Sequence, residues 1–236
     1  MTTGSCYALI PAAGMGRRMG AAINKQYLEL FGVPIVARTI QAFSRLDEIT
    51  GIVLVIPEQE IAYCQEQVID RYHLDKVVAI VPGGAERQQS VLNGLTYLTQ
   101  IAPPETVVLI HDGVRPFISR KLIREACSQT SPGVGTLVAV PVKDTIKIVE
   151  QGLVTGTPDR RTLWQAQTPQ SFTLGDIYDA HCAAQSAGLC TTDDCAVAEA
   201  YGITIRIIEG EYTNIKLTTP DDLHYGELLC RLTETD

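Results

Sequence analysis

The sequence lacks the features of a membrane or exported protein. Its longest apolar runs, such as residues 137–142, are far shorter than the ~20 residues that a membrane-spanning helix needs. Its first residues lack the basic segment and the apolar segment of a secretory signal. Its seven cysteines contain no Cys-x-x-Cys pair, and their odd number favours reduced thiols over a disulfide framework. We therefore expect a soluble, cytoplasmic protein with no membrane partner.

The sequence also has too few basic residues for a general nucleic-acid-binding surface. Nineteen Lys and Arg stand against 27 Asp and Glu, so the net charge is −8. That average charge repels nucleic acid, whereas a small phosphorylated ligand needs only a few well-placed cations. A hydrophobic content of 45% excludes a disordered, collagen-like or coiled-coil chain. No repeat or low-complexity linker divides the sequence, so we expect one domain over 1–236 and no nucleic-acid partner.

Short apolar segments alternate with helical patterns along much of the chain. The helical patterns lie near 34–45, 58–70, 86–99 and 119–129. The apolar segments are nearly continuous and rich in β-branched residues, as in strands buried on both faces; they are residues 7–10, 52–56, 77–81, 107–110 and 137–140. This alternation predicts an α/β fold with a doubly wound, mostly parallel sheet. In such sheets ligands bind beyond the carboxyl ends of the strands.

One stretch, residues 143–163, breaks the alternation. It has the pattern of two short strands around Gln151-Gly152, which predicts a β-hairpin. A hairpin that projects from an α/β domain either covers a site or pairs with another subunit. Further on, Thr219-Pro220 followed by two acids predicts the start of a last helix that ends near Arg231.

A loop of small residues follows the first predicted strand and carries several cations. It contains Gly14 and Gly16 and is followed by Arg18 and Lys25. Its small residues let the backbone approach a ligand, and its N–H groups can bind an anion. It is not the dinucleotide fingerprint, because Met19 stands at the third glycine position, and it has no Gly-Lys-Ser/Thr of a Walker A loop. We expect a phosphate-binding loop of another kind; the alternative is a mobile surface loop with solvated charges.

Two further strand ends carry candidate ligand-binding residues. His111-Asp112 directly follows the fourth strand, where a carboxylate is well placed to hold Mg²⁺ against phosphates. The alternative for Asp112 is a turn-forming residue, and we expect His111 to be a structural partner rather than a base. Gly83-Gly84 follows the third strand and allows close contact with a base or sugar, unless it forms a simple turn.

A second group of possible ligands lies around His181. Cys182, Cys190, Asp193, Asp194 and Cys195 follow it in the sequence. Their spacings match no familiar zinc pattern, so buried thiols are the better interpretation.

The ordered set of motifs resembles the 2-C-methyl-D-erythritol 4-phosphate cytidylyltransferase family of the non-mevalonate isoprenoid pathway. The resemblance covers nearly the whole chain. It implies a Rossmann-like nucleotidyltransferase domain with a protruding arm, a homodimer formed through that arm, and a reaction that joins CTP to methylerythritol phosphate and releases pyrophosphate. The motifs that carry it are Pro11-Ala-Ala-Gly-Met-Gly-Arg-Arg-Met19, Lys25-Gln-Tyr-Leu, Pro82-Gly-Gly84, His111-Asp-Gly-Val-Arg-Pro116, Asp144-Thr145, Asp159-Arg160, Gln167-Thr-Pro-Gln170, Thr192-Asp193 and Asn214-Ile-Lys216.

The resemblance also implies roles for individual residues. Arg18 and Lys25 match the transition-state stabilisers, Arg160 and Lys216 match the residues that position the sugar phosphate, and Asp112 matches the carboxylate near Mg²⁺. The other positions match substrate contacts: Ala12, Ala13, Gly83, Gly84 and Ser90 around cytidine, Thr145, Thr168 and Thr192 as polar contacts, and Gly14, Gly16 and Arg115 within the substrate-binding motifs.

Three positions depart from the family pattern. Ala85 and Thr213 stand where some members carry Asp, and Val114 replaces a frequent Ala.

Ribitol-5-phosphate cytidylyltransferase is the nearest enzyme alternative, although its loop tends to begin Ala-Gly-Gly. The other alternative is a non-catalytic nucleotide-binding regulatory domain. The presence of all five charged site residues argues against it; they are Arg18, Lys25, Asp112, Arg160 and Lys216.

Overall fold

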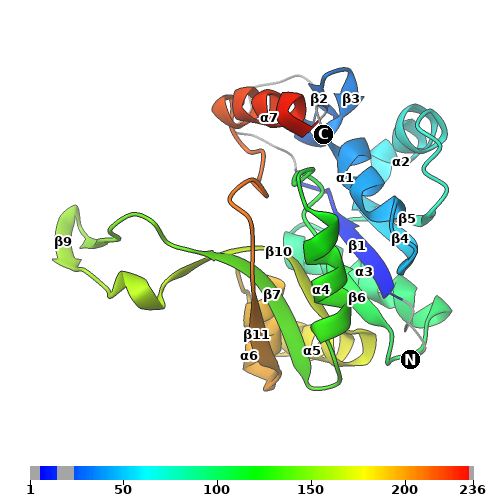
Figure 1. The fold of residues 1–236 in the computed structure, drawn as a ribbon. Helices are drawn as coiled ribbons and strands as arrows, with labels where there is room; N and C mark the ends of the chain where they lie inside the picture. The colour runs from blue at the N-terminus through cyan, green and yellow to red at the C-terminus, as the bar shows by residue number, and fades with distance from the viewer. Residues whose placement is uncertain (1–5, 15–23, 234–236) are drawn as a thin grey trace.

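The computed structural model describes residues 6–14 and 24–233, which form an α/β fold around a seven-stranded sheet (Figure 1). Strand β10 runs antiparallel to both of its neighbours, and every other adjacent pair is parallel. In spatial order the strands are β11 (Thr204–Glu209), β7 (Val134–Pro141), β10 (Trp164–Thr173), β6 (Val107–Ile110), β1 (Cys6–Pro11), β4 (Ile49–Ile56) and β5 (Val77–Pro82). The predicted α/β class with a mostly parallel sheet is confirmed.

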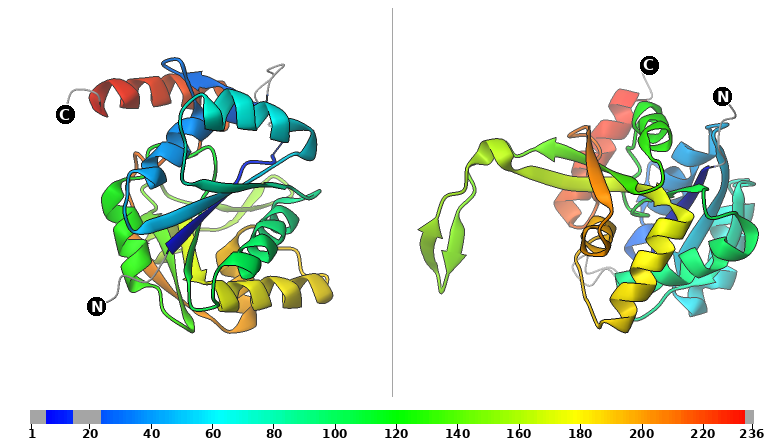
Figure 2. Two further views of the ribbon diagram at one scale, coloured as in Figure 1. Left: turned by 90° about the vertical axis from the view of Figure 1, so that its right-hand side faces the viewer. Right: turned by 90° about the horizontal axis from the view of Figure 1, so that it is seen from below.

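Apolar side chains on both faces of the sheet explain the layered architecture. Ala8 and Ile10 of β1 point into one core, and Leu9 between them points into the other. The first core is covered by α1 (Ile35–Ser44), α2 (Ile61–Cys64) and α4 (Arg120–Gln129). The second is covered by α3 (Arg87–Ile101), α5 (Leu174–Ser186) and α6 (Asp194–Tyr201). Figure 2 shows helices on both sides of the sheet.

The five predicted strands all lie within observed strands, but the sequence patterns did not reveal every element. The helix predicted over 58–70 is in fact three short pieces: a 3-10 turn, helix α2 and a π-helical turn over Gln65–Asp70. Strand β10 was missed because it is rich in Gln, Thr and Ser and contains Pro169. Tertiary contacts bury this polar strand from Gln167 onward, so composition alone gives little sign of it.

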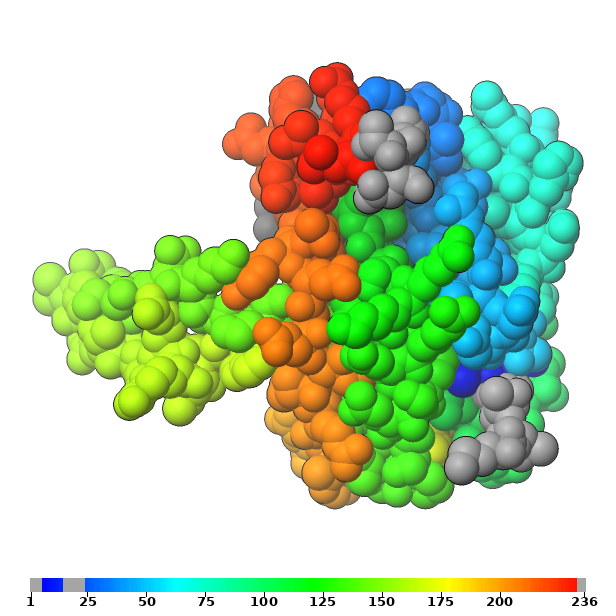
Figure 3. Space-filling view, viewed as in Figure 1, coloured from blue at the N-terminus to red at the C-terminus, as the bar shows by residue number. Residues whose placement is uncertain are grey.

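The predicted hairpin projects from the body as an arm (Figure 1). Strands β7 and β10 lead into it, and β8 (Ile148–Glu150) pairs with β9 (Leu153–Gly156) at its tip. The turn residues Gln151 and Gly152 have φ angles of 50° and 80°, the left-handed conformation that a tight two-residue hairpin turn requires. Figure 3 shows the arm standing clear of the body on the face in view.

The last helix covers one end of the sheet together with a small two-stranded ribbon. Helix α7 (Pro220–Thr233) and the ribbon of β2 (Glu29–Leu30) and β3 (Val33–Pro34) pack around a small apolar cluster that contains Val114 and Leu217. The predicted helix start is confirmed, since Thr219 Oγ1 accepts a hydrogen bond from the N–H of Asp222. Among the described residues, no helix is both long enough and apolar enough to cross a membrane.

The packing of β7 against β10 predicts the effect of one substitution. A Cβ atom at Gly135 would lie 2.5 Å from the ring of the buried Phe172 and 3.0 Å from the Ser171 carbonyl oxygen. We expect Gly135→Ala to lower the free energy of unfolding by about 1–3 kcal/mol, because the ring or the strand must move. Urea denaturation measures this. The matched control is Gly156→Ala, where the nearest atom is 3.4 Å away; equal unfolding midpoints for the two variants would contradict the prediction.

Candidate active site

Three loops meet at the carboxyl ends of β1, β5 and β6, and small residues allow this close approach. The N–H of Gly113 donates to the carbonyl of Pro11 at 3.2 Å, and the N–H of Gly83 donates to the carbonyl of Ile56 at 2.7 Å. A Cβ atom at Gly83 would lie 2.6 Å from the Cβ of Ala13, and one at Gly113 would lie 2.7 Å from that of Ala12. Side chains at the two glycines would therefore push the loops apart.

Asp112 lies at the centre of this edge and is surrounded by cations. Its Oδ2 lies 3.0 Å from Lys216 Nζ and 3.1 Å from Arg115 Nε, and its Oδ1 lies 3.6 Å from Arg87 Nε. Burial by itself raises the pKa of the Asp112 carboxyl, but Lys216, Arg87 and Arg115 outweigh burial and hold the pKa well below its usual range. The carboxylate is therefore ionised at neutral pH.

His111 and Thr168 hold the Asp112 turn from behind. The Thr168 hydroxyl accepts the Asp112 N–H at 3.1 Å and lies 3.0 Å from His111 Nδ1. His111 Nε2 lies 3.0 Å from the carbonyl oxygen of Arg115, which can only accept, so this nitrogen carries the proton and Nδ1 accepts from the hydroxyl. Burial lowers the pKa of His111 to about 4, so the ring is neutral. Both ring nitrogens are engaged, in agreement with the predicted structural role.

A second set of hydrogen bonds ties Lys216 to the same turn. Arg115 Nη1 donates to the carbonyl of Asn214 at 2.8 Å. The fully buried Asn214 donates from Nδ2 to the Thr168 carbonyl at 2.9 Å and to Gln167 Oε1 at 3.2 Å. These bonds fix the segment between β11 and α7, and with it the backbone that carries Lys216.

Arg87 links Asp112 to a second buried carboxylate. Its Nη2 lies 2.7 Å from Asp194 Oδ2, and His181 Nε2 lies 3.3 Å from Asp194 Oδ1. Asp194 is only 1% exposed. Burial raises the pKa of this carboxyl, but Arg87 and His181 outweigh burial and lower it. Arg87 is thus held between two carboxylates at the start of α3.

Two pockets adjoin at Asp112 and share Arg87, Asp112 and Lys216. The first has a volume of about 130 Å³; its other lining residues are Pro11, Ala12, Ala13, Gly14, Lys25, Gln26, Gly84, Ser90 and Val114. The second has a volume of about 250 Å³; its other lining residues are Arg115, Ala166, Gln167, Thr168, Gln170, Thr192 and Asp193. A ligand spanning both pockets would place its central atoms beside three cations and one carboxylate.

Most of the predicted site residues that can be described meet in these two pockets. Gly83 does not line them, but it permits the approach of the loop that bears Ala13, and the neighbouring Gly84 N–H donates to Ser90 Oγ at 3.0 Å. Thr145 and Arg160 instead lie on the exposed arm, where Arg160 Nη1 donates to the carbonyl of Lys143 at 2.6 Å. The predicted residues Gly16 and Arg18 lie outside the described residues.

Two of the three positions that depart from the family pattern lie outside these two pockets. Ala85 lines a separate pocket near Cys190, and Thr213 lines a cavity beside α7. Val114, by contrast, lines the first of the two pockets at Asp112. Neither Ala85 nor Thr213 is among the described residues that line those two pockets.

Sequence reasoning missed several residues that shape the site. Arg87 is the first residue of α3, shortly after Gly83-Gly84. This place at the start of a helix beside the predicted site is the sequence signal that could have identified it. Gln170 accepts the N–H groups of Asp194 and Cys195 through Oε1 and donates to Asp193, which fixes the start of α6. Gln170 and Asn214 stand in two of the family motifs, but nothing local in the sequence shows that their amides are buried structural partners.

Comparison with known proteins decides the family. The sequence profile described as "IspD: 2-C-methyl-D-erythritol 4-phosphate cytidylyltransferase" matches residues 6–231. The chain belongs to this family. Relatives bearing the family name include one from Geobacter metallireducens, 52% identical over 221 residues that cover 94% of this chain and 95% of that protein. One from Bacillus licheniformis is 45% identical and covers 94% of each chain.

Solved structures of the family share the fold. The 2-C-methyl-D-erythritol 4-phosphate cytidylyltransferase of Francisella tularensis has a TM-score of 0.81 and 32% identity, over 95% of this chain and 99% of that one. The enzyme of Thermus thermophilus has a TM-score of 0.75 and 30% identity, over 97% and 98%. The Rossmann-like nucleotidyltransferase fold that the sequence motifs imply is therefore confirmed.

The buried pair of Arg87 and Asp194 predicts a large stability effect. Arg87→Met would leave the Asp194 carboxylate buried with His181 alone, so we expect the free energy of unfolding to fall by about 3 kcal/mol or more. The control is Arg124→Met, which breaks an ion pair to Glu48 whose side chains are 57% and 29% exposed. We expect about 1 kcal/mol or less there. Urea denaturation compares the two, and a loss at Arg87 no larger than at Arg124 would contradict the prediction.

Proposed function

We propose that this protein transfers CMP from CTP to 2-C-methyl-D-erythritol 4-phosphate, forming 4-diphosphocytidyl-2-C-methyl-D-erythritol and pyrophosphate. Membership of the family over residues 6–231 supports the reaction. The main structural support for this reaction is that two pockets meet at Asp112, where Lys216, Arg87 and Arg115 surround its carboxylate. Such a junction suits a reaction that joins two phosphorylated substrates.

We assign the pocket beside the small-residue loop to the nucleotide. Ala12, Ala13 and Gly84 leave room for the backbone to approach a base or ribose, and Ser90 stabilises the Gly84 turn. Lys25 lines the same pocket, where its ammonium can meet the triphosphate. The motif match gives Arg18 the same task, and both cations would stabilise charge that grows at the α-phosphorus.

We assign the second pocket to the sugar phosphate. Lys216 stands at the junction and Arg115, Thr168 and Thr192 line the wall. A phosphate oxygen of this substrate attacks the α-phosphorus of CTP, and pyrophosphate leaves in line. Because that phosphate is already largely dianionic at neutral pH, no general base is needed, which suits the engaged ring of His111. Catalysis then rests on positioning and on charge stabilisation.

The residues present fit one Mg²⁺ ion. Asp112 is an ionised carboxylate, and among the described residues its Oδ1 forms an ion pair only with Arg87 Nε, at 3.6 Å, so this oxygen keeps lone pairs for a metal. Mg²⁺ is commonly held by one or two carboxylates together with substrate phosphates. We therefore propose Asp112 as the protein ligand. When bound, the ion would neutralise charge on the triphosphate and help pyrophosphate to leave.

The two alternative functions make different predictions in one assay. The purified protein is incubated with CTP and Mg²⁺, together with either methylerythritol phosphate or ribitol 5-phosphate, and pyrophosphate is measured. We expect pyrophosphate and the cytidylylated product with methylerythritol phosphate. Faster release with ribitol 5-phosphate would support the other cytidylyltransferase, and no release with either substrate would support a regulatory domain. The family assignment favours neither alternative.

Replacing the proposed metal ligand tests its role. We expect Asp112→Asn to raise the Mg²⁺ concentration needed for half-maximal activity by about tenfold or more, because one charged oxygen ligand is lost. Activity is titrated against Mg²⁺ for wild type, Asp112→Asn and the control Asp221→Asn, which changes an exposed acid of α7. Superimposable curves for wild type and Asp112→Asn would remove Asp112 from the metal site.

We further propose that the arm joins two chains into a homodimer. Its side chains Ile148, Val149, Leu153 and Val154 are 50–72% exposed in the single chain. A two-stranded hairpin is marginally stable alone in water, so a partner chain is its natural support. Thr145 and Arg160 lie on this arm rather than beside Asp112. We propose that they reach the sugar phosphate bound to the partner.

Mixing two inactive variants tests whether Arg160 acts in the partner's site. Arg160→Ala and Lys25→Ala chains are dissociated, mixed in equal amounts and allowed to reassociate. If Arg160 acts across the dimer, each heterodimer has one intact site and one that lacks both groups. Random pairing then restores about one quarter of wild-type activity.

The control for this experiment is each variant taken through the same treatment alone. Both should stay inactive, and native mass spectrometry should detect the heterodimer. A heterodimer without activity would mean that Arg160 acts within its own chain, and would leave the arm as a structural clasp.

We also propose a cytoplasmic location. No disulfide joins any of the seven cysteines, all of which lie among the described residues, and six of them are buried or partly buried, as suits a reducing compartment. Labelling of thiols in intact cells and after lysis tests their redox state.

A further inference from the structure

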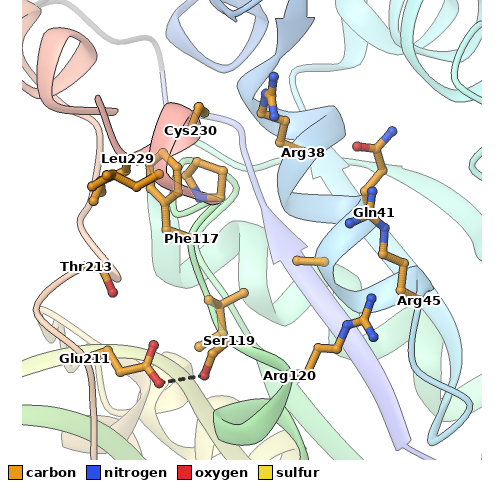
Figure 4. Close-up of a pocket in the computed structure, with 14 residues that line it drawn as sticks. Arg38, Gln41, Arg45, Phe117, Ser119, Arg120, Glu211, Thr213, Leu229 and Cys230 are labelled. Carbon is orange, nitrogen blue, oxygen red and sulfur yellow. Dashed lines mark hydrogen bonds between the residues drawn. The ribbon is translucent and has the colours of Figure 1, made fainter. Parts of the chain in front are cut away.

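A cavity of about 480 Å³ lies between α1, the start of α4 and α7 (Figure 4). It is larger than either pocket at Asp112 and shares no lining residue with them. A ligand in this cavity would therefore leave the catalytic pockets open. Nothing in the proposed reaction uses it.

One wall of the cavity is strongly cationic. Arg38, Gln41 and Arg45 follow one another at spacings of three and four residues, so they lie on one face of α1 and its end. Arg120, the first residue of α4, faces the same space (Figure 4). Glu211 is the one acid among the lining residues, so three guanidinium groups stand against one carboxylate. This is unusual for a chain of net charge −8.

These cations are not neutralised within the described part of the chain. Arg38 donates from Nε and Nη2 to the carbonyl of Leu30 at 2.9 and 2.7 Å, which fixes the side chain and leaves its other N–H groups for a ligand. Arg45 and Arg120 have no hydrogen bond or ion pair from their side chains to any described residue, whereas Arg124 on the same helix α4 pairs with Glu48 at 2.7 Å. The carboxylate of Glu211 accepts the Ser119 hydroxyl at 2.8 Å.

The opposite wall is apolar. It consists of side chains from the loop between β6 and α4 and from α7. They are Pro116, Phe117 and Ile118 of the loop, and Leu229 and Leu232 of the helix. Figure 4 shows Phe117 and Leu229 on one side of the cavity and the arginines on the other. A cavity with one cationic and one apolar wall suits a molecule that has one anionic and one apolar end.

Guanidinium groups bind phosphate with a matching pair of N–H donors, and several of them together favour phosphate strongly. We propose that this cavity binds a small organic phosphate bearing an apolar group. Its phosphate contacts Arg45 and Arg120, and its apolar group packs against Phe117 and Leu229. The site is separate from the one that binds CTP and the sugar phosphate.

The fluorescent probe 1-naphthyl phosphate tests the site, in the presence of saturating CTP and Mg²⁺ to fill the nucleotide pocket. We expect saturable binding to the wild-type protein, and a Kd raised by about tenfold or more in Arg45→Gln/Arg120→Gln, because two charge-assisted contacts are lost. Uncharged 1-naphthol has the apolar group of the probe without its phosphate, and inorganic phosphate lacks the apolar group. Each should bind about tenfold or more weakly than the probe.

The matched control is Arg71→Gln/Lys121→Gln, which removes the same two charges from exposed positions that do not line the cavity. We expect the wild-type Kd for this variant, and wild-type urea unfolding midpoints for both double variants. Equal weakening in the two double variants would mean that the probe responds to net charge alone. Loss of binding in Lys216→Met would place the probe in the catalytic site. Either result, or no binding by wild type, would overturn the proposal; none of these readouts measures transferase activity.

Discussion

The buried carboxylate of Asp112 depends on cations from three separate parts of the chain. Without Arg87, Arg115 and Lys216, an ionised Asp at 6% exposure would cost several kcal/mol of desolvation. The cations in turn are held by Asp194 and Asn214, so the charges at the active-site edge form one connected network. The two pockets lie where this network meets solvent, and both are lined by Arg87, Asp112 and Lys216.

Close packing of backbone places this network at the edge of the sheet. Gly83 and Gly113 let three loops approach to distances that side chains would prevent. The hydroxyl of Thr168 then accepts the N–H of Asp112, and the neutral ring of His111 accepts a hydrogen bond from that hydroxyl. Binding and catalysis by preorganised charge need this rigidity, since a displaced donor contributes little to a transition state.

The arm exposes apolar side chains, and the cavity between α1, α4 and α7 presents several arginines. On the arm, apolar side chains such as Leu153 are exposed to water, which favours burial against another chain. In the cavity, Arg45 and Arg120 lie together against an apolar wall, which favours an anion. In both places the complementary group does not come from residues 6–14 or 24–233, the part of the chain that the structure describes. The active-site edge differs, because there the opposite charges are already paired.

The layered α/β fold, the hairpin and the start of the last helix could be predicted from the sequence, because hydrophobic periodicity, Gln151-Gly152 and Thr219-Pro220 act through neighbours along the chain. Its motifs also identified Asp112, Lys25 and Lys216 as candidates. The place of strand β10 between β6 and β7, and the support that Arg87 and Asn214 give to Asp112, depend instead on tertiary contacts. The burial of a polar strand and the pairing of distant charges are set by which surfaces meet across the sheet, and no local pattern encodes that.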